Sequence, residues 1–128
     1  MVDYKEDKSR DFYRQLLDTN MIIDMGWASF QITLKDNLVD DDGDKCYGWV
    51  DFSARVMGLE RNMPDALARE TFSHEMWHIL LETVGYGDDL FDGKIITNNE
   101  HLTEAINKVV AIFKRLNPRL YRLLFWCH

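Results

Sequence analysis

The segment Thr71–Leu81 constrains this chain more than any other, because it places a His-Glu-x-x-His motif inside an apolar helical pattern. Side chains one helical turn apart lie above each other, so His74 and His78 project from the same face. Two imidazoles in this arrangement can both reach one Zn²⁺ at about 2.0–2.1 Å. Glu75 lies about 100° further around the helix, where a general base for an attacking water is needed. The motif predicts a zinc site with His74 and His78 as ligands and Glu75 as the base.

The surroundings of the motif favour this interpretation over two buried histidines that only make ordinary hydrogen bonds. The motif lies in the middle of a helix predicted from Asp65 to Thr83, with Pro64 and Asp65 suited to its first turn. Apolar residues cover most of the circumference of this helix. A helix of that kind belongs at the centre of a fold.

The remaining pattern predicts a helix, then strands, then helices, which is typical of an α+β domain. After a helix and two strands, a longer strand and a turn precede the central helix, and two helices follow it. The ranges are a helix over 9–18, strands over 21–25, 30–35 and 46–57, a turn over 58–62, a short extended piece at 94–96, a helix from 97–100 to Leu116, and a last helix over 119–126. We expect one domain over residues 1–128. Its short antiparallel or mixed sheet of about three strands would pack on the central metal-binding helix and the second long helix, a zincin-like arrangement.

Composition excludes several classes of function. A net charge of −7 with scattered basic residues argues against a nucleic-acid partner. The charged segment Met1–Lys8 is unlike a signal peptide, and no apolar run has the length of a membrane span. Cys46 and Cys127 are isolated thiols, as expected in the reducing cytosol. We therefore expect a cytoplasmic protein without a membrane partner, and the oligomeric state stays open.

An acidic loop carries Asp40, Asp42 and Asp44, which are spaced like the first ligands of a calcium-binding EF-hand loop. The pattern departs from that loop because Gly43 follows too early and Asp51 stands where a glutamate is needed. We predict an Asp-Gly turn between two strands instead.

A catalytic zinc site needs a third protein ligand and an open position. The candidates after the central helix are Glu100, His101 and Glu104. Three aspartates in the intervening loop are weaker candidates, namely Asp88, Asp89 and Asp92.

The His-Glu-x-x-His motif followed by a glutamate on a second helix resembles the gluzincin class of zinc metallopeptidases. More narrowly, the chain resembles the small single-domain branch of the ImmA/IrrE kind, which includes phage-encoded relatives. In that branch the second helix starts with Glu-Ala and continues with small and apolar residues, as Glu104–Phe113 does. The resemblance covers about residues 70–118. Trp77 departs from it where the family often has glycine, and so does the ending Leu116-Asn117-Pro118.

This resemblance implies a zinc endopeptidase that hydrolyses a peptide or protein substrate in the cytoplasm, with Zn²⁺ held by His74, His78 and Glu104. Glu100 and His101 remain alternatives to Glu104. Tyr86, Tyr47 and His101 are candidates for stabilising the oxyanion, and a substrate is expected to add along the edge of the strand over 46–57.

Two other functions stay open from the sequence. One is a zinc-binding regulatory or interaction module with a peptidase-like fold and no turnover, and the other is an α+β domain without metal. Glu75 favours the enzyme, because a purely structural zinc site has no use for a base.

Overall fold

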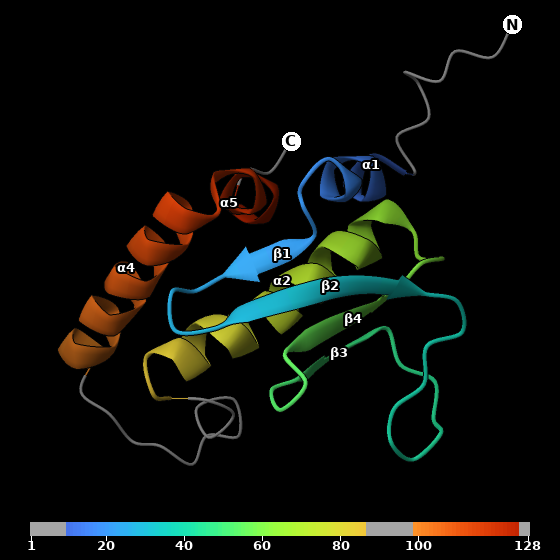
Figure 1. Cartoon of the computed structure of the whole chain (residues 1–128), viewed down its shortest axis with the longest axis horizontal. Helices are drawn as coiled ribbons and strands as arrows, with labels where there is room; N and C mark the ends of the chain where they lie inside the picture. Colours follow the sequence, from blue (N-terminus) through green and yellow to red (C-terminus); the bar gives the residue numbers. More distant parts are fainter. Residues whose placement is uncertain (1–9, 87–98, 126–128) are drawn as a thin grey trace, which may run out of the picture.

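Residues of alternating polarity form one mixed sheet, and apolar stripes at helical spacing place helices beside it (Figure 1). The computed structural model describes residues 10–86 and 99–125. Its elements in chain order are α1 (Asp11–Leu17), β1 (Ile22–Asp24), β2 (Ser29–Lys35), β3 (Gly48–Asp51), β4 (Val56–Glu60), α2 (Asp65–Thr83), α4 (Asn99–Leu116) and α5 (Pro118–Phe125). The predicted α+β class is confirmed.

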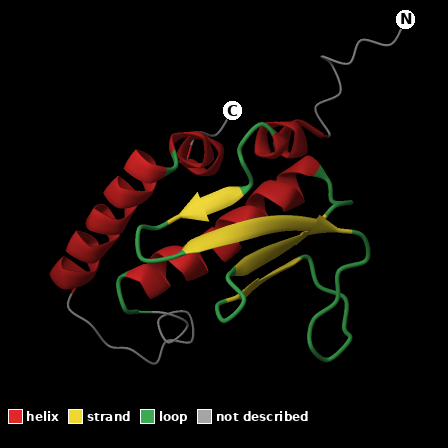
Figure 2. Ribbon diagram, in the orientation of Figure 1, coloured by secondary structure: helices red, strands yellow, loops and turns green. Residues whose placement is uncertain are grey.

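Helix α2 is the central element, as its apolar circumference predicts. It packs against α1, α4 and α5 and also against β3 and β4, and Figure 2 shows it running along one face of the sheet. Its fully buried side chains are Ala68, Phe72, Met76, Ile79 and Leu80. The predicted helix from Asp65 to Thr83 is confirmed.

The sheet has the strand order β1-β2-β4-β3, so β1 and β3 are its edges. Strands β2 and β4 are parallel, and the two outer pairs are antiparallel. Phe30 and Ile32 of β2 are buried while Ser29 and Gln31 are exposed, which confirms the predicted alternation. Ile32 is in register with Met57 of β4, and both join the core.

The single strand predicted over 46–57 is wrong, because the chain turns back between β3 and β4. The Asp51 carboxylate accepts hydrogen bonds from the backbone N–H groups of Ser53 and Ala54, each at 3.0 Å. Arg55 has a positive φ of 58° that completes the turn. The turn predicted over 58–62 is also wrong at its start, because β4 continues to Glu60. Within the described residues the sheet therefore has four strands where about three were expected.

The predicted Asp-Gly turn is present, but it closes an isolated bridge and does not join two paired strands, because β4 lies between β2 and β3. The backbone N–H of Asp40 donates to the Asp44 carbonyl, and the N–H of Gly43 donates to the Asp40 carbonyl. Gly43 has a positive φ of 82°. The turn joins Val39 and Lys45, which form a β-bridge. The side chain of Asp40 accepts hydrogen bonds from the backbone N–H groups of Asp42 and Asp44. These bonds explain the clustering of the three aspartates as turn chemistry.

The C-terminal part has the two predicted helices, α4 and α5. Val109 and Phe113 bury the apolar face of α4. Within 10–86 and 99–125, no helix has the length and apolarity to cross a membrane. Three predicted features lie outside the described residues: the extended piece at 94–96, the weaker ligand candidates Asp88, Asp89 and Asp92, and Cys127.

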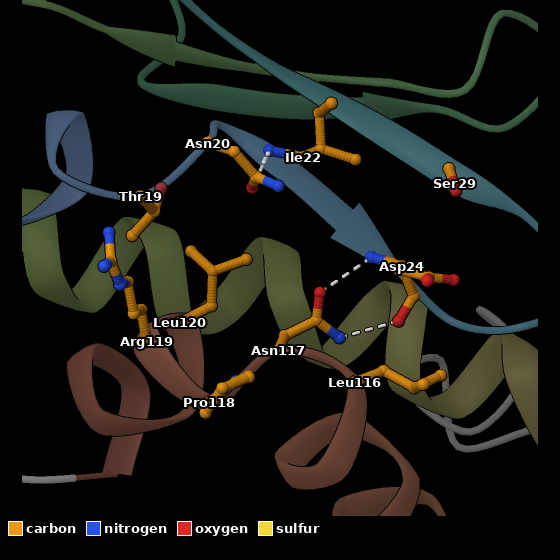
Figure 3. Close-up of a pocket in the computed structure, with 10 residues that line it drawn as sticks. All are labelled: Thr19, Asn20, Ile22, Asp24, Ser29, Leu116, Asn117, Pro118, Arg119 and Leu120. Carbon is orange, nitrogen blue, oxygen red and sulfur yellow. Dashed lines mark hydrogen bonds between the residues drawn. The ribbon is translucent and has the colours of Figure 1, made fainter.

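The free edge of β1 is held by an amide side chain at the junction of α4 and α5. Asn117 accepts a hydrogen bond from the Asp24 N–H at 2.8 Å and donates one to the Asp24 carbonyl at 2.6 Å. Figure 3 shows this pair at the wall of a hollow of about 350 Å³. Asn117 thus replaces a neighbouring strand at this position.

Glu60, at the end of β4, is a buried carboxylate that connects two loops. It accepts hydrogen bonds from the backbone N–H groups of Leu38, at 3.0 Å, and Asn62, at 3.1 Å. The bond from Leu38 contributes most to lowering the pKa of Glu60 below its ordinary value of 4.5; Asn62 and the charge of Lys45 add to this, and burial opposes it. Glu60 is therefore ionised at neutral pH and fixes the loop that leads into β3.

We expect Glu60→Gln to lower the free energy of unfolding by about 1–3 kcal/mol at neutral pH, because the backbone N–H groups of Leu38 and Asn62 lose a charged acceptor. The pKa of Glu60 is lower in the folded chain, so its contribution is complete above the unfolded pKa. It is lost as the pH falls through the folded value. Urea unfolding should therefore show that the difference in free energy of unfolding between wild type and variant becomes smaller as the pH is lowered into the acid range. Exposed Glu82→Gln is the control, and a gap independent of pH would contradict the role of the charge.

Candidate metal centre

His74 and His78 face each other across one turn of α2. Their Nε2 atoms are 3.2 Å apart, and the two rings meet edge to face at an angle of 81°. His74 is exposed and His78 is half-buried. On the opposite side of this turn, Met76 and Ile79 are fully buried, so the core fixes the helix that carries the pair.

The separation of the two Nε2 atoms fits a shared metal ion. Ligands of a tetrahedral zinc site, each about 2.0–2.1 Å from the metal, lie roughly 3.3 Å from each other. The observed 3.2 Å is close to this value. Imidazole nitrogens suit Zn²⁺ and several other divalent transition metals. The residues present therefore fit a divalent ion, without selecting zinc over related metals.

Glu75 completes the group, and β3 limits the space for its side chain. The ligand atoms of His74, Glu75 and His78 all lie within 4.8 Å of one another. A Cβ at Gly48 of β3 would lie 2.8 Å from Cγ2 of Thr71 and 3.1 Å from Cγ of Glu75. Glycine at this position lets the strand lie close to α2. The strand in turn lies close to the side chain of Glu75, which is buried.

The predicted third ligand, Glu104, lies on α4, which packs against α2. Glu104 and its alternatives Glu100 and His101 all have exposed side chains. Among the described residues, no cluster of mutually close ligand atoms joins any of the three to both histidines. Ligation by Glu104 would need its carboxylate to swing toward the pair, and it stays a prediction.

A hollow of about 350 Å³ opens beside the histidine pair, between α2 and the start of β3; it is termed here the α2–β3 hollow. Its lining residues come from these two elements: Tyr47, Gly48, Leu67, Glu70, Thr71, His74 and Glu75. Of the three predicted oxyanion donors, Tyr47 is the one that lines this hollow, on the β3 side that faces His74 and Glu75 of α2. The hollow therefore lies between the candidate metal-binding residues of α2 and the edge strand β3.

Several residues of this hollow were missed by sequence reasoning. Leu67, Glu70 and Thr71 share a helix face with His74 and Glu75, so their spacing was a usable signal. Gly48 offered another signal, because a glycine within an apolar strand often marks the close approach of another segment.

Cys46 lies near this group, but its thiol is kept protonated. Burial raises the pKa of Cys46 most, and the negative charges of Asp40, Glu75 and Glu60 raise it further. A thiol of raised pKa is a weak nucleophile at neutral pH. Cys46 is a free cysteine in the described part of the chain.

No protein-family model matches this chain, and no match was found among curated proteins or solved structures. The resemblance to gluzincins therefore stays a prediction. The histidine pair, Glu75 and the α2–β3 hollow are the features on which a proposed function can be based.

We expect Gly48→Ala to lower the free energy of unfolding by about 1–3 kcal/mol, because the new methyl group overlaps Cγ2 of Thr71 in a packed interface. Thr71→Ser deletes that Cγ2 atom and should recover part of the loss in the double variant. Thermal or urea unfolding of the wild type, the two single variants and the double variant measures this coupling. If Gly48→Ala cost the same in the wild-type and Thr71→Ser backgrounds, the close contact would be contradicted.

The identity of the third ligand can be tested by zinc titration of Glu104→Gln and Glu100→Gln. Loss of a residue that only orients a ligand typically weakens affinity by about 10–100-fold, and loss of the ligand itself should exceed this. We expect the larger loss for Glu104→Gln. Zinc affinity equal to wild type in Glu104→Gln would exclude Glu104 and direct attention to Glu100 or His101.

Proposed function

We propose that this protein is a metal-dependent peptidase, with zinc as the expected ion, that hydrolyses a peptide bond beside His74, Glu75 and His78. The proposal is supported above all by the 3.2 Å separation of the two Nε2 atoms. That separation suits a shared ion and coincides with a buried carboxylate in the same group. His74 and His78 would hold the metal, and Glu104 is the proposed third ligand.

Each side chain has a defined task in this reaction. A bound Zn²⁺ would polarise the scissile carbonyl and make a water molecule more acidic. Glu75 would accept the proton of that water as its oxygen adds to the carbonyl carbon. Glu75 would then pass the proton to the nitrogen of the leaving amine. The Tyr47 hydroxyl is our candidate for a further donor to the oxyanion, because Tyr47 lines the same hollow.

The edge strand β3 offers a place for an extended substrate. The Glu60 N–H donates to the Tyr47 carbonyl at 2.8 Å. Bonding pairs alternate in an antiparallel ladder, so the N–H and C=O groups of Gly48 and Val50 point away from β4. A peptide can pair with these outward groups. A second hollow, of about 460 Å³, adjoins Val50 further along the strand. Hydrolysis is therefore proposed for peptide segments bound in an extended form.

We expect Glu75→Gln to lower the turnover of a peptide substrate by about 10²–10⁴-fold, because an amide cannot take up the proton. The variant should bind zinc as the wild type does, since Glu75 is assigned no ligand role. Cleavage of casein, followed by mass spectrometry, and the zinc content of both proteins measure the two effects. Equal cleavage by wild type and variant, or zinc lost from the variant, would contradict the assignment of Glu75 as the base.

A further inference from the structure

We infer that the α2–β3 hollow binds a basic side chain of the substrate, lysine or arginine, next to the bond that is cut. The inference rests on the proposed peptidase function and adds a substrate class to it. Its basis is the order of side chains along α2 and the chemistry of the walls of the hollow.

The side chains of α2 that line the hollow form one row along the helix. Leu67, then Glu70 and Thr71, then His74 and Glu75 follow each other at intervals of one turn. The row runs from the histidine pair toward the beginning of α2, and Tyr47 and Gly48 of the β3 side face it. A substrate residue beside the histidines would therefore direct its side chain along this row, past Thr71 and toward Glu70.

The walls suit a side chain with an apolar stem and a cationic end. Leu67 and the ring of Tyr47 supply apolar surface for the methylene groups. The carboxylate of Glu70 is exposed at one side of the hollow, where it can pair with an ammonium or guanidinium group.

Charge also discriminates against other side chains. Glu70 and Glu75 line the same hollow, so an acidic substrate side chain would meet two like charges. The chain as a whole carries a net charge of −7, which favours the approach of basic segments. An apolar side chain would contact Leu67 and the ring of Tyr47, but it would give the Glu70 carboxylate no new partner.

The test uses binding, so it does not depend on turnover. The zinc-loaded Glu75→Gln protein is incubated with a pool of random octapeptides, and the retained peptides are sequenced by mass spectrometry. We expect lysine and arginine to be enriched about three- to tenfold over norleucine and glutamate at one position. Adding Glu70→Gln should remove this enrichment. Adding Glu82→Gln, which neutralises an exposed glutamate of α2 outside the hollow, should leave it intact.

Three results would overturn the inference: no retained peptides, no basic preference, or a basic preference that survives Glu70→Gln. The wild-type protein with the same pool separates this inference from the peptidase proposal. Cleavage without a basic preference overturns the inference and leaves the peptidase proposal standing. Glu70-dependent retention of basic peptides without any cleavage supports the recognition and contradicts the peptidase proposal.

Discussion

The packing of α2 is the constraint on which the rest of the structure depends. This helix contacts α1, α4, α5, β3 and β4, and its buried side chains form the middle of the core. The histidines and Glu70 occupy the part of its surface that these elements leave accessible. Since burial on the other sides fixes the helix, the spacing of the two histidine backbones is set by this packed helix and not by a loop. The two imidazoles are therefore already close together, whereas Glu104 would have to move toward them to act as a ligand.

Much of the fold follows from periodicity. Helix α2 and the strand β2 were predictable because their apolar residues repeat at helical or alternating spacing without interruption. The hairpin between β3 and β4 was not. Phe52, Ala54 and Val56 continue the alternation through the turn, and no glycine or proline marks it. The turn is made by the Asp51 carboxylate, which binds the backbone of Ser53 and Ala54. Local side-chain bonds of this kind compete with a strand and leave no periodic signal.

The candidate site, like the fold, has one part that the sequence predicts and another that it does not. The pairing of His74 and His78 was predictable, because both lie on one helix and the helix fixes their relation. The α2–β3 hollow depends on how closely a strand approaches that helix, and Gly48 decides this through a contact between segments far apart in the chain. Ligation by Glu104, which stays a prediction, depends on the rotation of α4 relative to α2 and on the reach of this side chain. Neither is encoded in the spacing of residues along one helix.

The most direct measurement of the central claim is the anomalous diffraction of a crystal of this protein grown with zinc. The account predicts one strong peak within about 2.0–2.1 Å of Nε2 of both His74 and His78, with a carboxylate oxygen at a similar distance. A crystal in which the two imidazoles bond each other with no peak between them, or in which zinc lies only on surface carboxylates such as Asp40 and Asp42, would contradict it.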